Sequence, residues 1–343
     1  MGLDLKPLLS AVPIKLAELS AKNVAVDAYN TIYQFLATIR GPSGEPLANS
    51  RGEITSHLSG LFYRNTNLLM ENIRPIYVYD GKAHELKVQE IERRAKLKKE
   101  ATEKYQLALE EGRMEDARKY SIRTSMLTDK MVEETKRLLD CLGIPHVQAP
   151  SDGEAAAAHL TKSGTAYAAA SQDYDSILFG ASRLVRNLAI SGKRKVPNRN
   201  AYVDVEPEML EHDKVLRELG LTHEQLVDVG ILIGTDFNPG GFPGIGPKTA
   251  LKLIREKGKL ENIEKIAHLL PEVPYDEIRK IFLSPELPKV DRLEFNQVNR
   301  EAVLDFLCVE KSFSADRVSG QLDRLQKAVT NRSQSLEQWF GSA

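Results

Sequence analysis

The chain has 343 residues, 42% of them hydrophobic and 28% charged, a composition typical of a folded protein with a sizeable core. Its 47 Lys and Arg nearly balance 48 Asp and Glu, so any basic surface that binds a polyanion must be local. The two Cys lie outside any paired spacing, which argues against a disulfide framework or a cysteine zinc site. The first residues make a poor signal peptide, and no apolar run of about 18 residues exists. We therefore expect an intracellular protein without a membrane span.

Short apolar segments alternate with helical patterns through the first half of the chain. Helical apolar spacing follows the first strand at 28–40, and the Ala-rich segment 153–164 predicts another helix. This alternation predicts an α/β fold, in which a central, mostly parallel, twisted sheet is flanked by helices. The predicted strands are 23–27, 74–81, 143–150 and 165–173.

Residues 81–130 differ from their surroundings in composition. They form helical patterns with few apolar residues and carry thirteen Lys or Arg against ten Asp or Glu. One explanation of this pattern is a pair of solvated helices without a special role. The other is a functional insertion that lies over the edge of the sheet.

A Gly- and Pro-rich stretch, "NPGGFPGIGPKTALKLIREKG", follows an amphipathic helical pattern at 221–237. Gly244 and Gly246 permit a tight turn, and the next residue, a proline, suits the first turn of a helix. Lys248 and Thr249 then lie at a helix N-terminus, where a phosphate can bind. A simple turn between two helices is the alternative.

Acidic residues directly follow several of the apolar segments. Because the carboxyl ends of neighbouring parallel strands meet at one crevice, acids from separate parts of the chain are predicted to meet there. Each acid alone is readily explained as a helix N-cap, but seven together, including two acid-x-acid pairs, favour oxygen ligands for two Mg²⁺ or Mn²⁺ ions. The seven are Asp27, Asp80, Asp152, Glu154, Asp173, Asp175 and Asp236.

The segments that carry these acids resemble the motifs of the flap endonucleases, structure-specific 5′ nucleases of DNA replication and repair. The matching segments are "VAVDAYNTIYQFL", "YVYDGK", "APSDGEAAAA", "SQDYDSILFG", "GTDFNPG" and "GIGPKTALKLI". The resemblance covers nearly the whole chain and is closer to archaeal than to eukaryotic members. It implies a PIN-like nuclease domain over 1–325, a helical arch at about 81–130 and a helix–two-turn–helix element at about 222–260.

Carried over residue by residue, the resemblance implies that the seven acids are the ligands of two Mg²⁺ ions, for which Mn²⁺ substitutes. The family usually has Glu where this chain has Asp152. The shorter side chain is expected to reach its ion through water.

The resemblance also implies that Lys87 and Arg94, at the base of the arch, act on the scissile phosphate. Seven residues are close to two helical turns, so both side chains share a helix face and are expected to offset charge in the transition state. Tyr33, taken alone, is a core aromatic. In the family the matching residue is a stacking platform for a base.

Further DNA contacts are implied at several positions. Arg40 and Arg64 match positions that touch DNA in relatives, and Gly2, the expected N-terminus after Met removal, is placed near the active site. The helix–two-turn–helix element is expected to hold duplex backbone without reading bases, and to hold a K⁺ ion. Its residues are Gly244, Gly246, Lys248 and Thr249.

The tail 326–343 is expected to be flexible and to carry a binding motif for the sliding clamp, proliferating cell nuclear antigen. Leu336, Trp339 and Phe340 would share one face of a helical turn, although packing on the protein's own surface is the alternative. Ser333 stands where the motif usually has Gln, so weaker clamp binding is expected.

These features predict a monomeric flap endonuclease of the cytoplasm or nucleoid, or of the nucleus in a eukaryote. It is expected to hydrolyse DNA carrying a 5′ flap, with accompanying 5′–3′ exonuclease activity. One alternative is a relative that prefers nicks, bubbles or exonucleolytic digestion. Another is a catalytically silent junction scaffold that recruits the clamp. A metal phosphatase is disfavoured because "VYDGK" lacks the Asp-x-Asp of the aspartyl-phosphate class.

Overall fold

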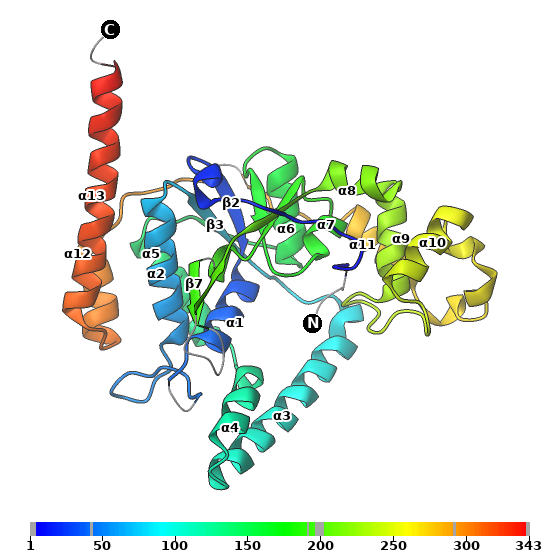
Figure 1. Ribbon diagram of the computed structural model, residues 1–343, viewed down its shortest axis with the longest axis horizontal. Helices are drawn as coiled ribbons and strands as arrows, with labels where there is room; N and C mark the ends of the chain where they lie inside the picture. Colours follow the sequence, from blue (N-terminus) through cyan, green and yellow to red (C-terminus); the bar gives the residue numbers. More distant parts are fainter. Residues whose placement is uncertain (1–4, 42–43, 191, 196–201, 291–292, 341–343) are drawn as a thin grey trace.

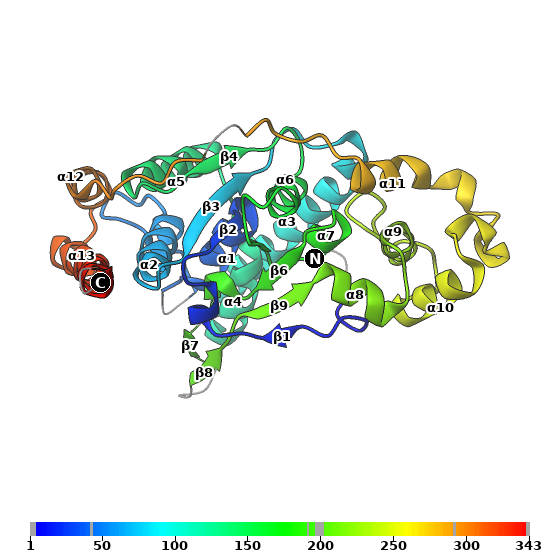
Figure 2. The same cartoon turned by 90° about the horizontal axis from the view of Figure 1, so that it is seen from above.

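A mixed sheet of seven strands forms the centre of the described part of the molecule (Figures 1 and 2). This computed structural model describes all residues except 1–4, 42–43, 191, 196–201, 291–292 and 341–343. The strands are β1 (Val12–Pro13), β2 (Asn23–Asp27), β3 (Arg74–Tyr79), β4 (His146–Gln148), β5 (Ala168–Ala170), β6 (Arg183–Arg186) and β9 (Glu208–Glu211). Their order is β1-β9-β6-β5-β2-β3-β4, and only the β1–β9 and β6–β9 pairings are antiparallel. The predicted α/β fold with a mostly parallel sheet is confirmed.

The strand boundaries differ in part from the predictions. β2 coincides with the predicted strand at 23–27, whereas β4 and β5 each cover three residues. The predicted strands at 143–150 and 165–173 were too long, because the chain leaves the sheet and bends toward the next helix after β4 and β5. The strands β1, β6 and β9, which form the two antiparallel pairings of the sheet, were not predicted. β1 has only two residues, and β6 and β9 are short and carry charged residues, so each gives a weak apolar signal. A separate hairpin joins β7 (Gly192–Lys195) and β8 (Tyr202–Val205).

Helices cover both faces of the sheet (Figure 2). The helices are α1 (Ala28–Thr38), α2 (Ser56–Met70), α3 (Val88–Glu110), α4 (Met114–Ser121), α5 (Asp129–Cys141), α6 (Gly153–Lys162), α7 (Asp175–Leu178), α8 (His212–Leu219), α9 (His223–Ile233), α10 (Pro247–Lys257), α11 (Tyr275–Leu283), α12 (Arg300–Leu304) and α13 (Ala315–Phe340). Short helical turns are η1 (Leu16–Leu19), η2 (Glu85–Lys87), η3 (Ile122–Thr124), η4 (Leu188–Ile190), η5 (Leu260–Asn262), η6 (Glu264–Ile266), η7 (Leu270–Glu272) and the π-helix η8 (Asp305–Glu310). None of the described helices is long and apolar enough to cross a bilayer.

Alternation along the central strands divides the core into two layers. In β3, Ile76 and Val78 face the layer that contains α6 and α9, whereas Tyr77 and Tyr79 face the layer that contains α1, α2 and α5. Strand β5 consists of three alanines, and the residues of α6 that pack on it are also alanines. Such small side chains let the helix lie close to the sheet.

The hairpin of α3 and α4 projects from the body at the end of the sheet where β2 and β3 finish (Figure 1). One expectation from the sequence was an insertion over the edge of the sheet, whereas the hairpin projects away from the sheet. Ala101 and Ala108 of α3 and Ala117 of α4 are buried between the two helices, while much of the charged surface is exposed. Gly112, with φ +69°, permits the turn between them.

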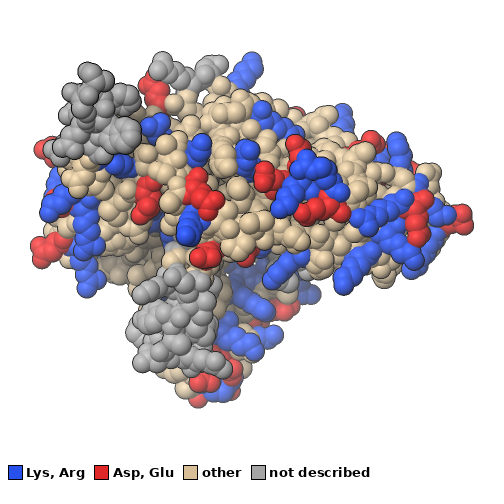
Figure 3. All heavy atoms as spheres, turned by 45° about the horizontal axis from the view of Figure 1, so that its top comes forward, with Lys and Arg blue, Asp and Glu red and all other residues tan. Residues whose placement is uncertain are grey.

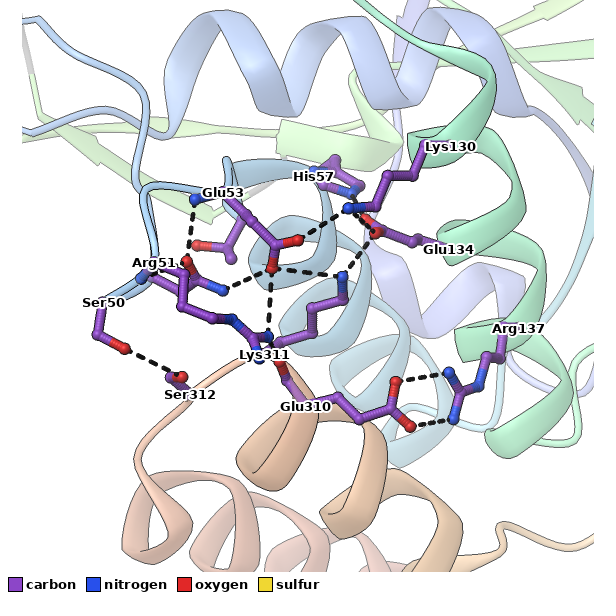
Figure 4. Close-up of polar contacts among 12 residues, drawn as sticks. Ser50, Arg51, Glu53, His57, Lys130, Glu134, Arg137, Glu310, Lys311 and Ser312 are labelled. Carbon is purple, nitrogen blue, oxygen red and sulfur yellow. Dashed lines mark hydrogen bonds and ion pairs between the residues drawn. The ribbon is translucent and has the colours of Figure 1, made fainter.

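A network of ion pairs attaches the C-terminal helices to the body (Figure 4). Lys311, directly after η8, donates to Glu134 of α5 at 2.6 Å, and the buried His57 of α2 contacts the same carboxylate at 3.1 Å. Burial alone would raise the pKa of Glu134, but these two hydrogen bonds hold it below its ordinary value. The network therefore joins α2, α5 and the segment that leads into α13 through charges that are mostly withdrawn from water.

Helix α13 runs without a break to Phe340 and extends beyond the body (Figure 1). No Gly or Pro interrupts the helical sequence between Gly320 and Phe340, which favours one continuous helix through 326. The flexibility of the tail 326–343 stays a prediction. Leu336, Trp339 and Phe340 lie in the last turns of this helix, and their side chains lie outside the described part.

The Glu134 network predicts a difference in stability between two lysine variants. Lys311→Met removes the ammonium and leaves the Glu134 carboxylate without its closest cation, so we expect the free energy of unfolding to fall by about 3 kcal/mol in urea denaturation. Lys130→Met is the control, because the Lys130 side chain is 67% exposed and water screens its pairs with Glu53 and Glu134, so its loss should change the stability little. Equal losses would contradict the prediction.

Candidate metal centre

The seven predicted acids lie at or just beyond the carboxyl ends of central strands, or in loops that pack there. Asp27 ends β2, Asp80 follows β3, and Asp173 follows β5. The other four reach the same place from the start of α6, the start of α7 and the loop after α9. The structure thus gathers side chains separated by up to about two hundred residues at one end of the sheet.

The helix-capping explanation holds for only one of these acids. The Asp27 carboxylate accepts from the backbone N–H of Asn30 at 2.9 Å and caps α1. Asp152 occupies the N-cap position of α6, but its side chain makes no capping hydrogen bond. Asp175 is already inside α7, whose N-cap is Tyr174. Capping alone therefore does not account for the cluster.

The carboxylates act strongly on one another. Burial, followed by the charges of neighbouring carboxylates, raises the pKa of both Asp27 and Asp175 to about 8. Burial and the charges of Asp175, Asp27 and Asp173 raise the pKa of Glu154 well above its ordinary value, and burial raises the pKa of Asp80. Asp27, Asp80, Glu154 and Asp175 therefore favour protonation in the absence of a counter-charge.

Two cations from the base of the α3–α4 hairpin enter this cluster. The Lys87 ammonium pairs with Asp152, and Arg94 donates to both oxygens of Asp236 at 2.7 and 2.9 Å. Lys87 also lies over the Phe237 ring, with its nitrogen 4.9 Å from the ring centroid. Burial alone would lower the pKa of Lys87, but the nearby Asp152 carboxylate outweighs burial, and the pKa lies above its ordinary value. Lys87 therefore stays charged. The predicted basic residues thus meet the predicted acids directly.

The fit of these residues to a divalent cation can be tested from their chemistry. Within the described residues, no three His, Cys, Asp or Glu side chains stand in a ready-made ligand arrangement. The donors are nevertheless all carboxylate oxygens, which suit Mg²⁺ and Mn²⁺. Among the described residues, one oxygen of Asp175 is buried without a hydrogen-bond partner, and a hydrogen-bond donor or a bound cation would satisfy it. The site therefore fits the predicted ions in donor type and charge.

Two polar residues that the sequence analysis did not single out organise the acids. The Ser171 hydroxyl lies 3.3 Å from Asp27 and 3.2 Å from Glu154, and the Asn30 amide donates to Asp173 at 2.9 Å. Asn30 lies in the first turn of a helix after an acid, and Ser171 lies two residues before an acid pair; these positions are the only sequence signals they carry.

Gly153 permits a close approach of the backbone to Asp80. Its backbone N–H donates to Asp80 at 2.6 Å, and a Cβ atom on Gly153 would lie 2.7 Å from the same carboxylate oxygen. Any larger residue would push Asp80 away from the cluster.

The predicted DNA contacts in the first helices lie in different environments. The Tyr33 side chain is 41% exposed, with the Lys98 ammonium of α3 5.8 Å from its ring centroid, so the interpretation of Tyr33 as a core aromatic is wrong. Arg40 donates to the carbonyl of Gly44 and to the Ser125 hydroxyl, and thereby ties the loop after α1 to the end of the hairpin. Arg64 lines a small cavity behind the site. Gly2 lies outside the described residues.

The Gly- and Pro-rich turn has its predicted form. Gly244 has φ +73°, and α10 begins at Pro247 with Gly246 as its N-cap. Lys248 and Thr249 are exposed in the first turn of α10. Figure 3 shows Lys and Arg side chains, with some acids between them, gathered at the end of the molecule that carries α10. Exposed basic residues there are Lys248, Lys252, Arg255, Lys257 and Lys259.

Comparisons with known proteins identify the family of this chain. Residues 3–101 match the XPG N-terminal domain and residues 143–236 match the XPG I-region. Flap endonuclease 1 of Nitrosopumilus maritimus is 56% identical over 340 residues, covering 99% of this chain and 100% of the relative. The chain belongs to the flap endonuclease family. The family relationship that the motifs predicted is thus confirmed, as is its archaeal character.

Two further members of the flap endonuclease family support this assignment. Flap endonuclease 1 of Saccharolobus solfataricus is 50% identical, covering 98% of this chain and 100% of the relative. The solved structure of flap endonuclease-1 from Methanococcus jannaschii superposes with a TM-score of 0.74 at 38% identity, covering 96% of this chain and 100% of that one. The PIN-like nuclease fold is confirmed.

The raised pKa values predict how the stability of the metal-free protein depends on pH. Because Asp27 and Asp175 are protonated up to about pH 8 in the folded protein but only up to about pH 4 when unfolded, the folded state binds more protons between these values. We expect the free energy of unfolding in EDTA to fall as pH rises from 5 to 8, by more than about 1 kcal/mol per pH unit. Thermal denaturation across this range measures the trend.

An Asp175→Asn variant provides the control for this pH dependence. It cannot release that proton, so its stability should change less with pH than that of the parent protein. A parent protein whose melting temperature rose with pH in EDTA would contradict the assignment of raised pKa values.

Proposed function

We propose that this member of the flap endonuclease family hydrolyses DNA phosphodiesters at the junction between single-stranded and double-stranded DNA, with 5′ flaps as its main substrate and an accompanying 5′–3′ exonuclease activity. The observation that carries the proposal is the convergence of seven carboxylates beside two cations from the base of a projecting helical hairpin. Relatives of nearly the same length that carry the name flap endonuclease 1 support it. Replication and repair are the processes that generate such junctions.

The carboxylate cluster is the proposed site of two Mg²⁺ ions, with Mn²⁺ as a substitute. When bound, these ions would stabilise the attacking and leaving oxygens of a phosphodiester displacement. The proposed ligands are Asp27, Asp80, Asp152, Glu154, Asp173, Asp175 and Asp236. Their negative charge, concentrated by burial, is what would draw the ions from water.

Lys87 and Arg94 are the proposed contacts of the scissile phosphate. Both already lie among the carboxylates, and the Lys87 ammonium also lies over the ring of Phe237. A phosphate that enters the cluster would meet both cations without a large movement of the hairpin. Their role is to position the phosphate and to offset negative charge as the bond breaks.

Contacts with the rest of the DNA are proposed from three surfaces. Tyr33 of α1 is exposed and would stack against a base near the cut. Arg40, Arg64 and Gly2 remain proposed contacts on the strength of the resemblance. The exposed N-terminus of α10, with Gly244, Gly246, Lys248 and Thr249, would hold duplex phosphates through backbone N–H groups and lysine.

Three further features rest on sequence resemblance. The last turns of α13 carry Leu336, Trp339 and Phe340 at helical spacing, which supports binding of a sliding clamp. A K⁺ ion at the turn before α10 remains a prediction. The enzyme is proposed to be a monomer. Its proposed location is the cytoplasm or nucleoid, or the nucleus in a eukaryote.

Asp173→Asn tests the proposed metal centre. The substitution keeps the side chain's shape but removes its charge, so we expect Mg²⁺-dependent cleavage of an end-labelled 5′-flap substrate to fall by about a hundredfold or more, the scale for loss of one preorganised electrostatic group. Asp213→Asn, at a side chain that is 86% exposed on α8, should leave the rate unchanged. Full activity of Asp173→Asn would overturn the site assignment.

The parent protein also tests the two alternative functions. Absence of turnover with either Mg²⁺ or Mn²⁺ would favour the junction scaffold. Faster cleavage of nicked or bubble DNA than of flap DNA would favour a relative with that preference.

Arg94 and its neighbour Arg93 form a matched pair for testing the role of the hairpin. Both donate to the Glu90 carboxylate at 2.6 Å, but of the two only Arg94 has a recorded hydrogen bond to Asp236. We therefore expect Arg94→Ala to lower kcat by about a hundredfold and Arg93→Ala to change it less than about threefold, the effect of an exposed ion pair. Equal effects would show that Arg94 acts through Glu90 alone.

A further inference from the structure

Asn30 contacts both ends of the carboxylate cluster. Its backbone N–H donates to Asp27 at 2.9 Å, and its side-chain Nδ2 donates to Asp173 at 2.9 Å. Its side-chain oxygen accepts from the backbone N–H of Gln172 at 3.3 Å. One residue of α1 thus holds an acid at the end of β2 and an acid just after β5.

The two side-chain contacts fix the direction of the Asn30 amide. The Gln172 N–H needs an acceptor and the Asp173 carboxylate needs a donor, so the two ends of the amide are not interchangeable. Among the described residues, the Asp173 carboxylate accepts its hydrogen bond from Asn30. An apolar residue here would leave Asp173 free to rotate away or toward Arg94.

The strands that carry the two acids are direct neighbours. β2 pairs with β5 in parallel, with Val26 opposite Ala170, so their ends have a fixed spacing. The chain beyond β5 bends, however, and the backbone alone does not set where Asp173 points. The Asn30 side chain supplies the missing constraint.

We propose that Asn30 is a positioning residue of the metal centre: it sets the direction of Asp173 relative to Asp27, so that both carboxylates face the same ion. The inference rests on the proposed metal-dependent nuclease function. Hydrogen bonds that orient ligands typically change metal affinity by about 10- to 100-fold when removed. Asn30 acts through Asp27 and Asp173 and does not touch DNA in this role.

Asn23 offers a matched control. It is a half-buried asparagine at the other end of β2, and its Nδ2 donates to the carbonyl of Thr165, just before β5. Asn23→Ala therefore removes the same kind of tie between the same two strands, away from the carboxylates. A purely structural role predicts similar effects for the two asparagines.

Mn²⁺ binding to the otherwise metal-free protein is the deciding measurement, made by titration calorimetry or electron paramagnetic resonance. We expect Asn30→Ala to raise the Mn²⁺ dissociation constant by about 10- to 100-fold, whereas Asn23→Ala should leave it within about twofold of the parent value. Asn30→Leu, which keeps the side chain's volume, should behave as Asn30→Ala and replaces it if the alanine variant does not fold. Equal affinities for the Asn30 and Asn23 variants would overturn the inference.

Kinetics on 5′-flap DNA provide the second readout. In the Asn30 variant, kcat should fall at low Mg²⁺ and recover as Mg²⁺ is raised, while KM for DNA stays unchanged, because only occupancy of the metal centre is weakened. A parent protein that binds Mn²⁺ but does not cleave the DNA would sink the proposed nuclease function, and the affinities would still decide the role of Asn30. A parent protein that binds no Mn²⁺ would overturn both.

Discussion

The confinement of negative charge at one end of the sheet is the constraint on which the rest of the site depends. Parallel strands place acids at one end of the sheet, and burial there raises the pKa of Asp27 and Asp175 to about 8, so that these two carboxyls resist ionisation. Such a cluster is stable only when protonated, paired with cations or bound to metal. The placement of Lys87 and Arg94 follows from this requirement as much as from any need for a phosphate contact.

The helical hairpin gains its orientation from the same electrostatics. Beyond its first turn, α3 packs mainly on α4, and its outer surface is charged and exposed. The contacts of Lys87 with Asp152 and of Arg94 with Asp236 tie its base to the body. Divalent ions and phosphate would compete for the partners of these ties. The hairpin base is therefore electrostatically coupled to whatever the carboxylates bind.

The sequence predicted the parallel centre of the sheet and all seven acids, because strand-end acids and apolar runs are local signals. It did not predict the antiparallel pairings of β9 with β1 and β6. For Tyr33 the residue alone favoured a core aromatic, whereas the family resemblance implied a stacking platform, and the residue is exposed. Asn30 and Ser171 were also missed. A polar residue in a first helical turn has many explanations, and its role appears only when another strand brings Asp173 within 2.9 Å.

Small side chains explain how so many acids come together. β5 is made of alanines, and α6 places its own alanines against the sheet, so helix and strand approach closely. Glu154, in the first turn of α6, then reaches the Ser171 hydroxyl just after β5. A larger residue at Ala156 or Ala169, both fully buried, would separate the two elements and move Glu154 away from Asp27 and Asp173. The packing of the core and the charge density of the site are thus set by the same alanines, and neither can change without the other.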